Sequence, residues 1–450
     1  MGNKINTRRI ALDILVRYER EGRKLTPLLL DILEDYDEMD RRDRAFVASL
    51  AEGVVERLIT LDWVINEVSD RHTDKMKPVI RMIIRLGAYQ LLFMDHVPDS
   101  ASVNESVKLA RSKHMDGLSG FVNGVLRAIA RLRDEGIEYP DAETEYSCPK
   151  WIADTFRSSF GDTNAETMIK AGIGAGNLYL RVNHCLIDKI SLKNKLMDEG
   201  IETETVLTED GEELPYTLLV KSGKLVPSES ESFRKGLYSV QDLSSQRAIY
   251  ELWNCILVYI NKRSRVDINI IDLCAAPGGK TCFLAEMLDG QKDKLSDVRY
   301  SLKAFDISDA KLNKIRENIY RAGSHNICAC VNDATVFNVE MERSVDIIIA
   351  DLPCSGLGVI GRKVDIKYRT KQEDIVALCK LQRNILENAA RYLRPNGILM
   401  FSVCTVTKEE TAEQASYIEK LGLHKISERL FLQGVDPCDG FYYSIWQGRG

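Results

Sequence analysis

Hydrophobic residues follow two different periods along this chain of 450 residues. Between residues 5 and 133 they recur at helical spacing, and the segment 79–93 (V-I-R-M-I-I-R-L-G-A-Y-Q-L-L-F) has the pattern expected of the most buried helix. Short polar connections separate the stretches, as they do in antiparallel helical bundles. The pattern therefore predicts an N-terminal bundle of about six or seven helices.

From residue 268 onward, short β-branched runs alternate with amphipathic segments. Such alternation predicts a parallel sheet with helices on both faces, and a last pair of strands closes the chain. The strands are expected near residues 268–274, 300–305, 326–332, 345–350, 397–403, 424–431 and 440–447. The helices are expected at residues 279–288, 308–322, 372–393 and 408–421.

A shorter region of mixed pattern lies between the bundle and the sheet. Residues 134–146 are acidic and irregular, which is typical of a linker. Helices are then expected at 151–160, 165–171 and 192–199, and strands at 178–183 and 217–226. We therefore expect three domains, which are an all-helical bundle over 1–135, a small α+β domain over 146–237 and an α/β Rossmann-like domain over 238–450.

The composition is that of an ordinary globular protein, with 44% hydrophobic and 28% charged residues. No run of 18 apolar residues is present, so the sequence predicts no membrane span, and residues 1–9 lack the apolar core of a secretory signal. Eleven cysteines without a C-x-x-C pair predict free thiols in a reducing compartment and no metal site. We expect a monomeric cytoplasmic protein.

The net charge of −6 disfavours a uniformly basic surface for nucleic acid. An RNA-binding function therefore requires a local cluster of basic residues. One such cluster follows the fourth expected strand of the sheet and contains Arg362, Lys363, Lys367, Arg369 and Lys371. The sequence predicts that these side chains contact phosphate, although a solvated surface would show the same pattern.

The segment 270–281 (I-I-D-L-C-A-A-P-G-G-K-T) carries the clearest chemical signal. It predicts a buried strand, a tight turn and the start of a helix, which is the place where open α/β sheets bind ligands. Gly278 and Gly279 allow the backbone to approach a ligand closely. The segment matches neither the dinucleotide pattern G-x-G-x-x-G nor the triphosphate pattern G-x-x-x-x-G-K-[ST]. An ordinary glycine-rich turn is the alternative, but ten specified residues in succession favour a binding loop.

Three more of the expected strands are followed by residues that can take part in chemistry. Asp306 follows the second strand, where a carboxylate can accept hydrogen bonds from ribose hydroxyls or cap the next helix. Asp351 and Cys354 follow the fourth strand in D-L-P-C-S-G, and Cys404 follows the fifth. A lone cysteine usually packs inertly. Two cysteines at the carboxyl ends of neighbouring strands, beside a binding loop, predict an active site.

The motif D-L-C-A-A-P-G-G-K-T resembles the S-adenosylmethionine-binding loop of the RNA 5-methylcytosine methyltransferases, and more narrowly that of the Sun/RsmB family, which methylates ribosomal RNA. D-L-P-C-S and V-C-T resemble the two cysteine motifs of that family, whose usual forms are D-x-P-C-S and T-C-S. The helical segments R-L-G-A-Y-Q-L-L-F-M and F-V-N-G-V-L-R are similar to the NusB-type RNA-binding domain that the family carries at its N-terminus. Residues 361–367 depart from the family pattern, because they read G-R-K-V-D-I-K where R-R-x-P-D-I-K is usual.

The resemblance, which covers nearly the whole chain, implies a cofactor, a substrate and roles for named residues. Cys404 is expected to attack C6 of a cytosine in small-subunit (16S) ribosomal RNA, and Cys354 to release the product. Asp351 is expected to hydrogen-bond the base, and Lys280 either supports charge nearby or is only structural. S-adenosylmethionine is expected to bind Cys274, Ala275, Ala276, Pro277, Gly278, Gly279, Lys280, Asp306, Asp333 and Asp351. For Asp333 the alternative is a turn-forming role.

Other functions fit parts of the same pattern. The substrate could be another ribosomal RNA site or a tRNA. A DNA cytosine methyltransferase would use the cysteine of the Pro-Cys motif as its nucleophile. A non-catalytic RNA-binding assembly factor could be built on a degenerate methyltransferase fold. Two cysteines and the helical bundle favour RNA, and the retention of Cys404 and of the two glycines favours an enzyme.

Overall fold

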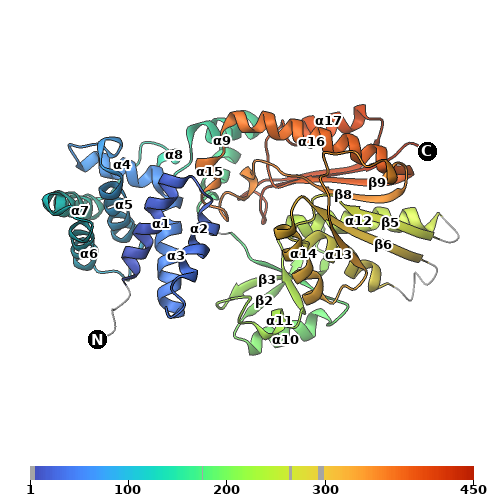
Figure 1. Cartoon of the computed structure of the whole chain (residues 1–450), viewed down its shortest axis with the longest axis horizontal. Helices are drawn as coiled ribbons and strands as arrows, with labels where there is room; N and C mark the ends of the chain where they lie inside the picture. Colours follow the sequence, from blue (N-terminus) through green and yellow to red (C-terminus); the bar gives the residue numbers. More distant parts are fainter. Residues whose placement is uncertain (1–5, 175, 263–265, 292–297) are drawn as a thin grey trace. The chain divides into compact units, whose positions relative to one another are not determined.

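The computed structural model describes residues 6–174, 176–262, 266–291 and 298–450, which form two compact units (Figure 1). The helical unit contains Met1–Gly174 together with Ile360–Arg369, and the sheet unit contains Ala175–Val359 and Thr370–Gly450. The boundaries predicted for three domains stay a prediction. Part of the expected N-terminal segment 1–9 and part of the sequence just before the second expected strand of the sheet lie outside the described residues.

Helices α1 to α7 form the bundle that the apolar spacing predicted in the helical unit. Helix α1 (Thr7–Glu21) begins after Asn6, whose side chain accepts a hydrogen bond from the Arg9 N–H, and ends at Gly22 in the left-handed conformation. Helix α5 (Pro78–Phe93) is largely buried, and it packs against α1, α3, α4, α6 and α7. The other bounds are α2 (Leu25–Glu34), α3 (Arg41–Glu56), α4 (Leu58–Val68), α6 (Asp99–Ser112) and α7 (Ser119–Glu135), with 3-10 turns η1 (Thr73–Lys75) and η2 (Asp116–Leu118).

Two further helices complete the N-terminal part of the helical unit. Helix α8 (Ala142–Glu145) lies in the stretch that was predicted to be a linker. The range α9 (Lys150–Lys170) contains two helical segments, because the backbone at Gly161 is not helical (φ 78°, ψ 164°), and these segments correspond to the helices expected at 151–160 and 165–171.

Residues 360–369, which come late in the chain, pack in the helical unit. The Leu25 N–H donates a hydrogen bond of 3.0 Å to the Asp365 carboxylate. The Tyr368 hydroxyl lies 3.0 Å from the carbonyl oxygen of Ser147 and 3.1 Å from that of Glu56. The helical unit is therefore assembled from two stretches that are far apart in the sequence.

This packing corrects the expectation that five basic residues form one phosphate-binding patch. Lys367 is only 1% exposed, and burial lowers its pKa to about 8. Arg369 ends the short helix α15 (Ile366–Arg369) and donates to the carbonyl oxygen of Gly22. Val364, at the position where the family usually has proline, packs against the apolar core of the bundle. The local sequence shows the basic residues, but it does not show the long-range packing that buries Lys367.

The sheet unit contains a small antiparallel sheet with the strand order β2-β3-β1-β4. Only β1 (Tyr179–Val182) was predicted closely. The strands expected around a turn at 217–226 are instead the end of one strand, β3 (Glu213–Ser222), and β2 (Glu202–Leu207) was missed because most of its side chains are exposed. The remaining elements are β4 (Tyr238–Val240), α10 (Lys189–Asp198) and α11 (Glu231–Arg234).

The larger sheet of this unit has seven strands in the order β10-β11-β9-β8-β5-β6-β7. Strands β5 to β9 are parallel, as predicted, and β11 runs antiparallel to both β9 and β10. The bounds are β5 (Val266–Asp272), β6 (Val298–Asp306), β7 (Ile327–Val331), β8 (Val345–Asp351), β9 (Leu393–Val403), β10 (His424–Phe431) and β11 (Phe441–Gln447). The strand order reverses between β5 and β8, and open α/β sheets bind ligands outside the carboxyl ends of strands at such a point.

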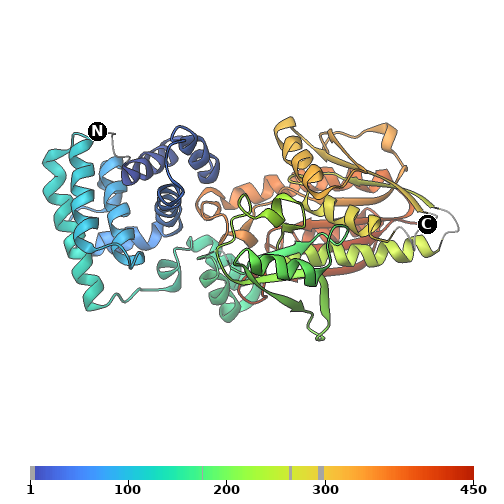
Figure 2. The ribbon, with the colours of Figure 1, turned by 90° about the horizontal axis from the view of Figure 1, so that it is seen from below.

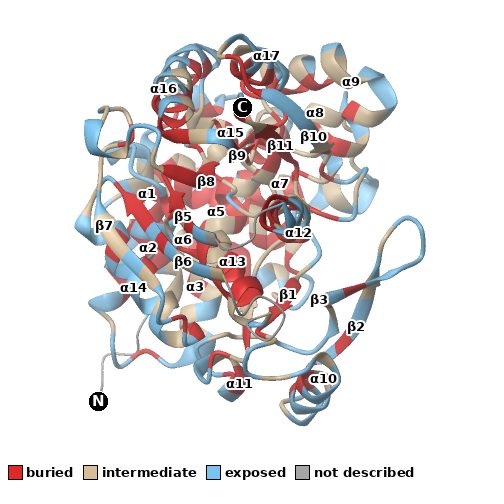
Figure 3. Cartoon of the chain, turned by 90° about the vertical axis from the view of Figure 1, so that its right-hand side faces the viewer, coloured by how far each residue is buried: buried red, intermediate tan, exposed pale blue. Residues whose placement is uncertain are grey.

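Helices cover both faces of the seven-stranded sheet, as expected (Figures 1 and 2). One face is covered by α12 (Leu243–Asn261), α13 (Gly279–Asp289) and α14 (Asp309–Ala322), and the other by α16 (Gln372–Tyr392) and α17 (Ala412–Lys420). The central strands are buried in Figure 3, and Ile347, Ile348 and Ile349 of β8 are fully enclosed. The 3-10 turns of this unit are η3 (Val339–Met341) and η4 (Leu357–Val359).

Among the residues that the structure describes, none of the helices combines the length and the apolar character needed to cross a membrane.

Replacing Tyr368 with phenylalanine should destabilise the helical unit. The ring is kept, but the carbonyl groups of Ser147 and Glu56 lose this donor, which should cost about 1–2 kcal/mol. We expect a lower midpoint of thermal unfolding by circular dichroism, and an unchanged midpoint for Lys363→Ala, whose side chain is exposed. Equal midpoints for wild type and Tyr368→Phe would contradict the role of this hydroxyl.

Candidate active site

The loop between β5 and α13 is fixed to the strands on both sides of it. The Leu273 N–H donates to the carbonyl oxygen of Ile349 on β8 at 2.9 Å, and the Ala275 N–H donates to that of Phe305 on β6 at 2.8 Å. Gly278 adopts a φ of 100° immediately before α13, a conformation that glycine reaches without strain. The predicted binding loop therefore lies where β5, β6 and β8 end.

The loop borders a cavity that also contains Asp272, a residue to which the sequence analysis gave no role. Asp272 ends β5 and is 1% exposed, and burial raises its pKa to about 7. One carboxylate oxygen accepts a hydrogen bond of 2.6 Å from the Thr281 hydroxyl, while the other has no partner among the described residues. The cavity is lined by Val240, Gln241, Ser245, Asp272, Cys274, Ala275, Ala276, Pro277, Gly279, Lys280 and Asp351.

Asp306 is bonded directly to the loop, whereas Asp333 lies farther away. The Asp306 carboxylate accepts hydrogen bonds from the Ala276 N–H at 3.1 Å and from the Lys311 ammonium at 2.9 Å. Helix α14 has Ser308 as its N-cap, so Asp306 does not cap it. Asp333 follows β7, two strands from β5, and its carboxylate accepts from the backbone and hydroxyl of Thr335. These bonds form a turn and lower the pKa of Asp333.

Lys280 and Asp351 form an ion pair between the first turn of α13 and the end of β8. The Lys280 ammonium lies 2.7 Å from one Asp351 carboxylate oxygen. The Ser402 hydroxyl donates to the other oxygen at 2.7 Å, so both oxygens of this carboxylate are held. Lys280 also lies 4.9 Å from the centre of the Phe441 ring. The two residues that were predicted to support the reacting base are therefore in contact.

The structure brings the two predicted cysteines together, since the sulfur atoms of Cys354 and Cys404 are 3.3 Å apart. Strands β8 and β9 pair in parallel with Asp351 opposite Ser402, and each cysteine lies just beyond the end of its strand. The hydrogen bond to Cys404, burial, and the nearby charges of Cys404 and Glu410 raise the pKa of the Cys354 thiol.

The residue after each cysteine carries a hydroxyl group, and the two hydroxyl groups lie within hydrogen-bond distance of each other. The Ser355 and Thr405 hydroxyl oxygens are 2.8 Å apart, and Ser355 also bonds to the buried carboxylate of Glu410. Val403, where the family has threonine, is fully buried in the core. The hydroxyl that the sequence retains after Cys404 is therefore the one that bonds in the site. The sequence analysis singled out neither Ser355 nor Glu410, although Glu410 stands in the sequence K-E-E at 408–410, shortly after Cys404.

The small sheet supports the binding loop from the side. Arg181 on β1 donates from one guanidinium nitrogen to the Gly279 carbonyl oxygen and the Gln241 side chain, both at 2.6 Å. Its other terminal nitrogen lies 2.7 Å from the Glu286 carboxylate on α13. Arg181 and Glu286 are 1% and 2% exposed. The ion pair thus joins the small sheet to the helix that follows the loop.

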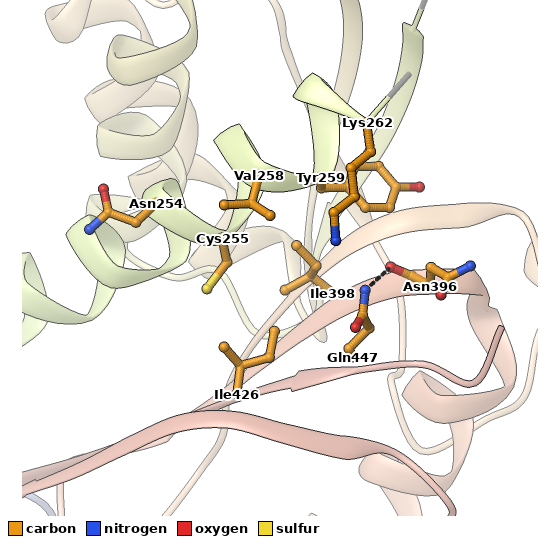
Figure 4. A pocket seen from close by; sticks show the side chains of 9 residues that line it. All are labelled: Asn254, Cys255, Val258, Tyr259, Lys262, Asn396, Ile398, Ile426 and Gln447. Carbon is orange, nitrogen blue, oxygen red and sulfur yellow. Dashed lines mark hydrogen bonds between the residues drawn. The ribbon is translucent and has the colours of Figure 1, made fainter. Parts of the chain in front are cut away.

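A second pocket opens toward the amino end of β9, whereas Cys404 lies beyond the carboxyl end of that strand (Figure 4). Its lining includes none of the predicted site residues. The residues around it are Asn254, Cys255, Val258, Tyr259, Lys262, Asn396, Ile398, Ile426 and Gln447.

The chain is similar in sequence to known methyltransferases. Residues 260–431 match the family model described as 16S rRNA methyltransferase RsmB/F, and residues 5–131 match that of the NusB family. A probable ribosomal RNA small subunit methyltransferase B of Bacillus subtilis is 31% identical over 420 residues, covering 91% of this chain and 87% of that protein. A ribosomal RNA small subunit methyltransferase B of Klebsiella pneumoniae is 27% identical over 458 residues, covering 99% and 98%.

Solved structures of similar fold cover most of the chain. The crystal structure of PH0851 aligns with a TM-score of 0.75 and 21% identity, and covers 99% of this chain and 100% of that one. The structure of NSun6 from Pyrococcus horikoshii with SFG aligns with a TM-score of 0.54 and 20% identity, and covers 67% and 98%. Together with the two family matches, these likenesses confirm the predicted fold class.

Removing the charge of Arg181 should strongly destabilise the sheet unit. In Arg181→Met the buried Glu286 carboxylate loses its partner, and the loss of one member of a buried pair costs about 3–5 kcal/mol. Arg181→Met/Glu286→Leu should recover most of that loss, because no unpaired charge is then buried. Urea unfolding followed by tryptophan fluorescence measures both variants. A single variant as stable as wild type would show that the pair does not matter for the fold.

Proposed function

The chain belongs to the RsmB/F family of S-adenosylmethionine-dependent 16S rRNA methyltransferases, and from this membership we propose that it methylates C5 of one cytosine through a covalent bond between Cys404 and C6. The observation that carries the proposal is the pair of sulfur atoms 3.3 Å apart, just beyond the ends of β8 and β9, with Cys354 close in sequence to Asp351 of the Lys280–Asp351 ion pair. The NusB-type bundle supports RNA as the substrate.

The residues around the binding loop fit the cofactor. Loop residues Cys274 to Pro277, Gly279 and Lys280 line the cavity, and Asp272 offers a buried carboxylate oxygen that has no hydrogen-bond partner among the described residues. An oxygen of this kind can accept a hydrogen bond from an ammonium group of a ligand. We assign Asp306, which is held against the loop through Ala276, to the ribose hydroxyls of the cofactor. When bound, S-adenosylmethionine supplies an electrophilic methyl group at this edge of the sheet.

A nucleophilic cysteine is required because C5 of cytosine is too weak a nucleophile to accept a methyl group directly. Addition of a thiolate to C6 makes the ring an enamine, and C5 then becomes nucleophilic. In the proposed mechanism the Cys404 thiolate forms the bond to C6. Cys354, whose raised pKa makes it retain its proton, can donate a hydrogen bond to the sulfur of Cys404 before the attack.

The adduct is resolved by proton transfer from C5. After methylation the C5 proton must leave, the electron pair re-forms the C5–C6 double bond, and the sulfur of Cys404 departs from C6 as a thiolate. We assign the release step to Cys354: its thiol proton passes to solvent, and the thiolate, which the raised pKa makes a strong base, then accepts the C5 proton. Asp351, fixed by Lys280 and Ser402, is assigned to the N3/N4 edge of the base.

The alternatives differ in what they require of the site. A DNA-type assignment makes Cys354 the nucleophile, and the short distance between the two sulfur atoms is compatible with either cysteine in that role. A non-catalytic assembly factor would not need both cysteines, Lys280 and Asp351 to be assembled at one edge. Another rRNA cytosine or a tRNA would use the same chemistry. We propose that the enzyme acts as a monomer in the cytoplasm, where ribosomal RNA is its substrate.

Asp306→Ala should weaken S-adenosylmethionine binding. The variant loses a charged acceptor for the ribose and the bond to the Ala276 N–H, which together should lower affinity about 10- to 100-fold. Isothermal titration measures the change. Asp309→Ala, three residues away and exposed, is the matched control and should bind as wild type does. Equal affinity in wild type and Asp306→Ala would remove this carboxylate from the site.

The two cysteine variants should behave differently with substrate RNA. Cys404→Ser should neither methylate nor form an adduct, because a serine hydroxyl ionises far less readily than a thiol. Cys354→Ser should attack and methylate but fail to release the product, so a protein–RNA species that survives denaturing electrophoresis should accumulate. Its methylated form should require both RNA and S-adenosylmethionine.

Cys330→Ser is the control for these variants, since this thiol lies on β7 away from the site, and it should methylate normally. An adduct in Cys404→Ser together with none in Cys354→Ser would reverse the assignment in favour of the DNA-type order. No adduct and no methylation in wild type would instead support the assembly-factor alternative.

A further inference from the structure

The carboxylate of Glu410 bonds to the residue that follows each of the two cysteines, and it is completely buried. It follows β9 on the segment that leads to α17. One of its oxygens accepts from the Ser355 N–H at 2.9 Å and from the Gln382 side chain at 3.2 Å. The other lies 2.5 Å from the Ser355 hydroxyl and 2.9 Å from that of Thr407. Every oxygen of this buried group is therefore occupied by protein donors.

These bonds connect the two loops that carry the cysteines. Ser355 is the residue after Cys354, and it bonds to Glu410 through both its backbone and its side chain. Thr405 is the residue after Cys404, and its hydroxyl lies 3.2 Å from the same carboxylate. One carboxylate thus reaches both loops at the residue next to each sulfur.

A buried carboxylate is an energetically unfavourable hydrogen-bond acceptor at this position. A buried charge carries a desolvation penalty that hydrogen bonds only partly offset, and an uncharged polar residue could satisfy hydroxyl groups at lower cost. The Ser355 N–H, however, needs an acceptor, and a carboxylate can accept from the backbone and from several hydroxyls at once. Its negative charge also acts on Cys354, whose pKa it helps to raise.

We propose that Glu410 is a positioning residue that joins the Cys354 loop to the Cys404 loop and sets the distance between the two sulfur atoms. Its effect on catalysis rests on the proposed methyltransferase function, whereas its effect on the geometry does not. The carboxylate contacts neither the binding loop nor the predicted cofactor residues through the bonds described above. Its loss should therefore change the chemical step and leave cofactor affinity unchanged.

Kinetics of RNA methylation provide the first test. Displacement of a catalytic group by about 1 Å can cost about 100-fold in rate, so Glu410→Ala should lower kcat by about that factor. The KM for RNA and the Kd for S-adenosylmethionine should stay within about twofold of wild type, because binding interactions are untouched. Glu410→Asp, which retains the charge on a shorter side chain, should recover part of the rate. Glu409→Gln changes the adjacent, exposed carboxylate and is the matched control.

Disulfide formation provides a readout that does not depend on methylation. The azo compound diamide takes one hydrogen from each thiol onto its N=N bond, and the two sulfurs close to a bond of about 2.05 Å. Cys354 and Cys404 start 3.3 Å apart, so the wild type should form this disulfide rapidly. Glu410→Ala should form it at least about tenfold more slowly if the distance is no longer fixed. Peptide mapping by mass spectrometry identifies the bridge among the eleven cysteines.

The charge is tested separately with Glu410→Gln, which has the same shape and keeps an acceptor for the Ser355 N–H. Removal of the negative charge lowers the pKa of Cys354, so its alkylation by iodoacetamide should shift to lower pH. A purely structural role would leave that pH profile in place. Because the variant is isosteric, it also serves if Glu410→Ala does not fold.

The outcomes separate this inference from the proposed function. Unchanged disulfide formation in folded Glu410→Ala, with wild-type kcat, would overturn the positioning role. An unshifted alkylation profile in Glu410→Gln would overturn the effect of the Glu410 charge on Cys354, and the disulfide test on Glu410→Ala then decides the positioning role. If the wild type forms the disulfide, the variant does so slowly and neither methylates RNA, the positioning role stands and the proposed function fails.

Discussion

Hydrogen bonding of β5 to parallel strands on both sides is the constraint on which the site depends. Asp272, the last residue of β5, pairs with Ala304 of β6 and with Ile349 of β8, so both neighbouring strands run two residues beyond it, to Asp306 and Asp351. Asp351 pairs with Ser402 of β9 in the same way. Since side chains at strand ends cannot move along the sheet without breaking its register, these four ends fix where the loop, the carboxylates and the sulfurs can lie.

Three carboxylates share this edge, and the protein stabilises each of them differently. Asp351 is paired with Lys280 and bonded by Ser402. Asp306 is paired with Lys311 and bonded by the backbone of the loop. Among the described residues no lysine bonds to Asp272, and its burial favours the protonated form near neutral pH. The local charge of the edge is therefore smaller than the number of aspartates suggests, which suits the proposed binding of a cationic cofactor and an anionic RNA.

Much of this arrangement was predictable, because it follows from local pattern. Strands β8 and β10 were placed to within one residue, and the cysteines were expected at neighbouring strand ends. Strand β2 was missed because an exposed edge strand lacks alternation of apolar residues. Lys367 was misjudged because its burial depends on contacts with residues more than 200 positions away. The burial of Asp272 could not be predicted either, because the sequence does not show whether an aspartate at the end of a strand is desolvated.

The late segment 360–369 has a consequence for the order in which the protein forms during synthesis. The helices of the bundle emerge from the ribosome first, yet the Leu25 N–H and the carbonyl groups that face Tyr368 have no final partners until residue 369 has emerged. By then β5 to β8 have already been made. The unit that is translated first is thus completed late, and a nascent chain that is released early would expose the surface that this segment covers.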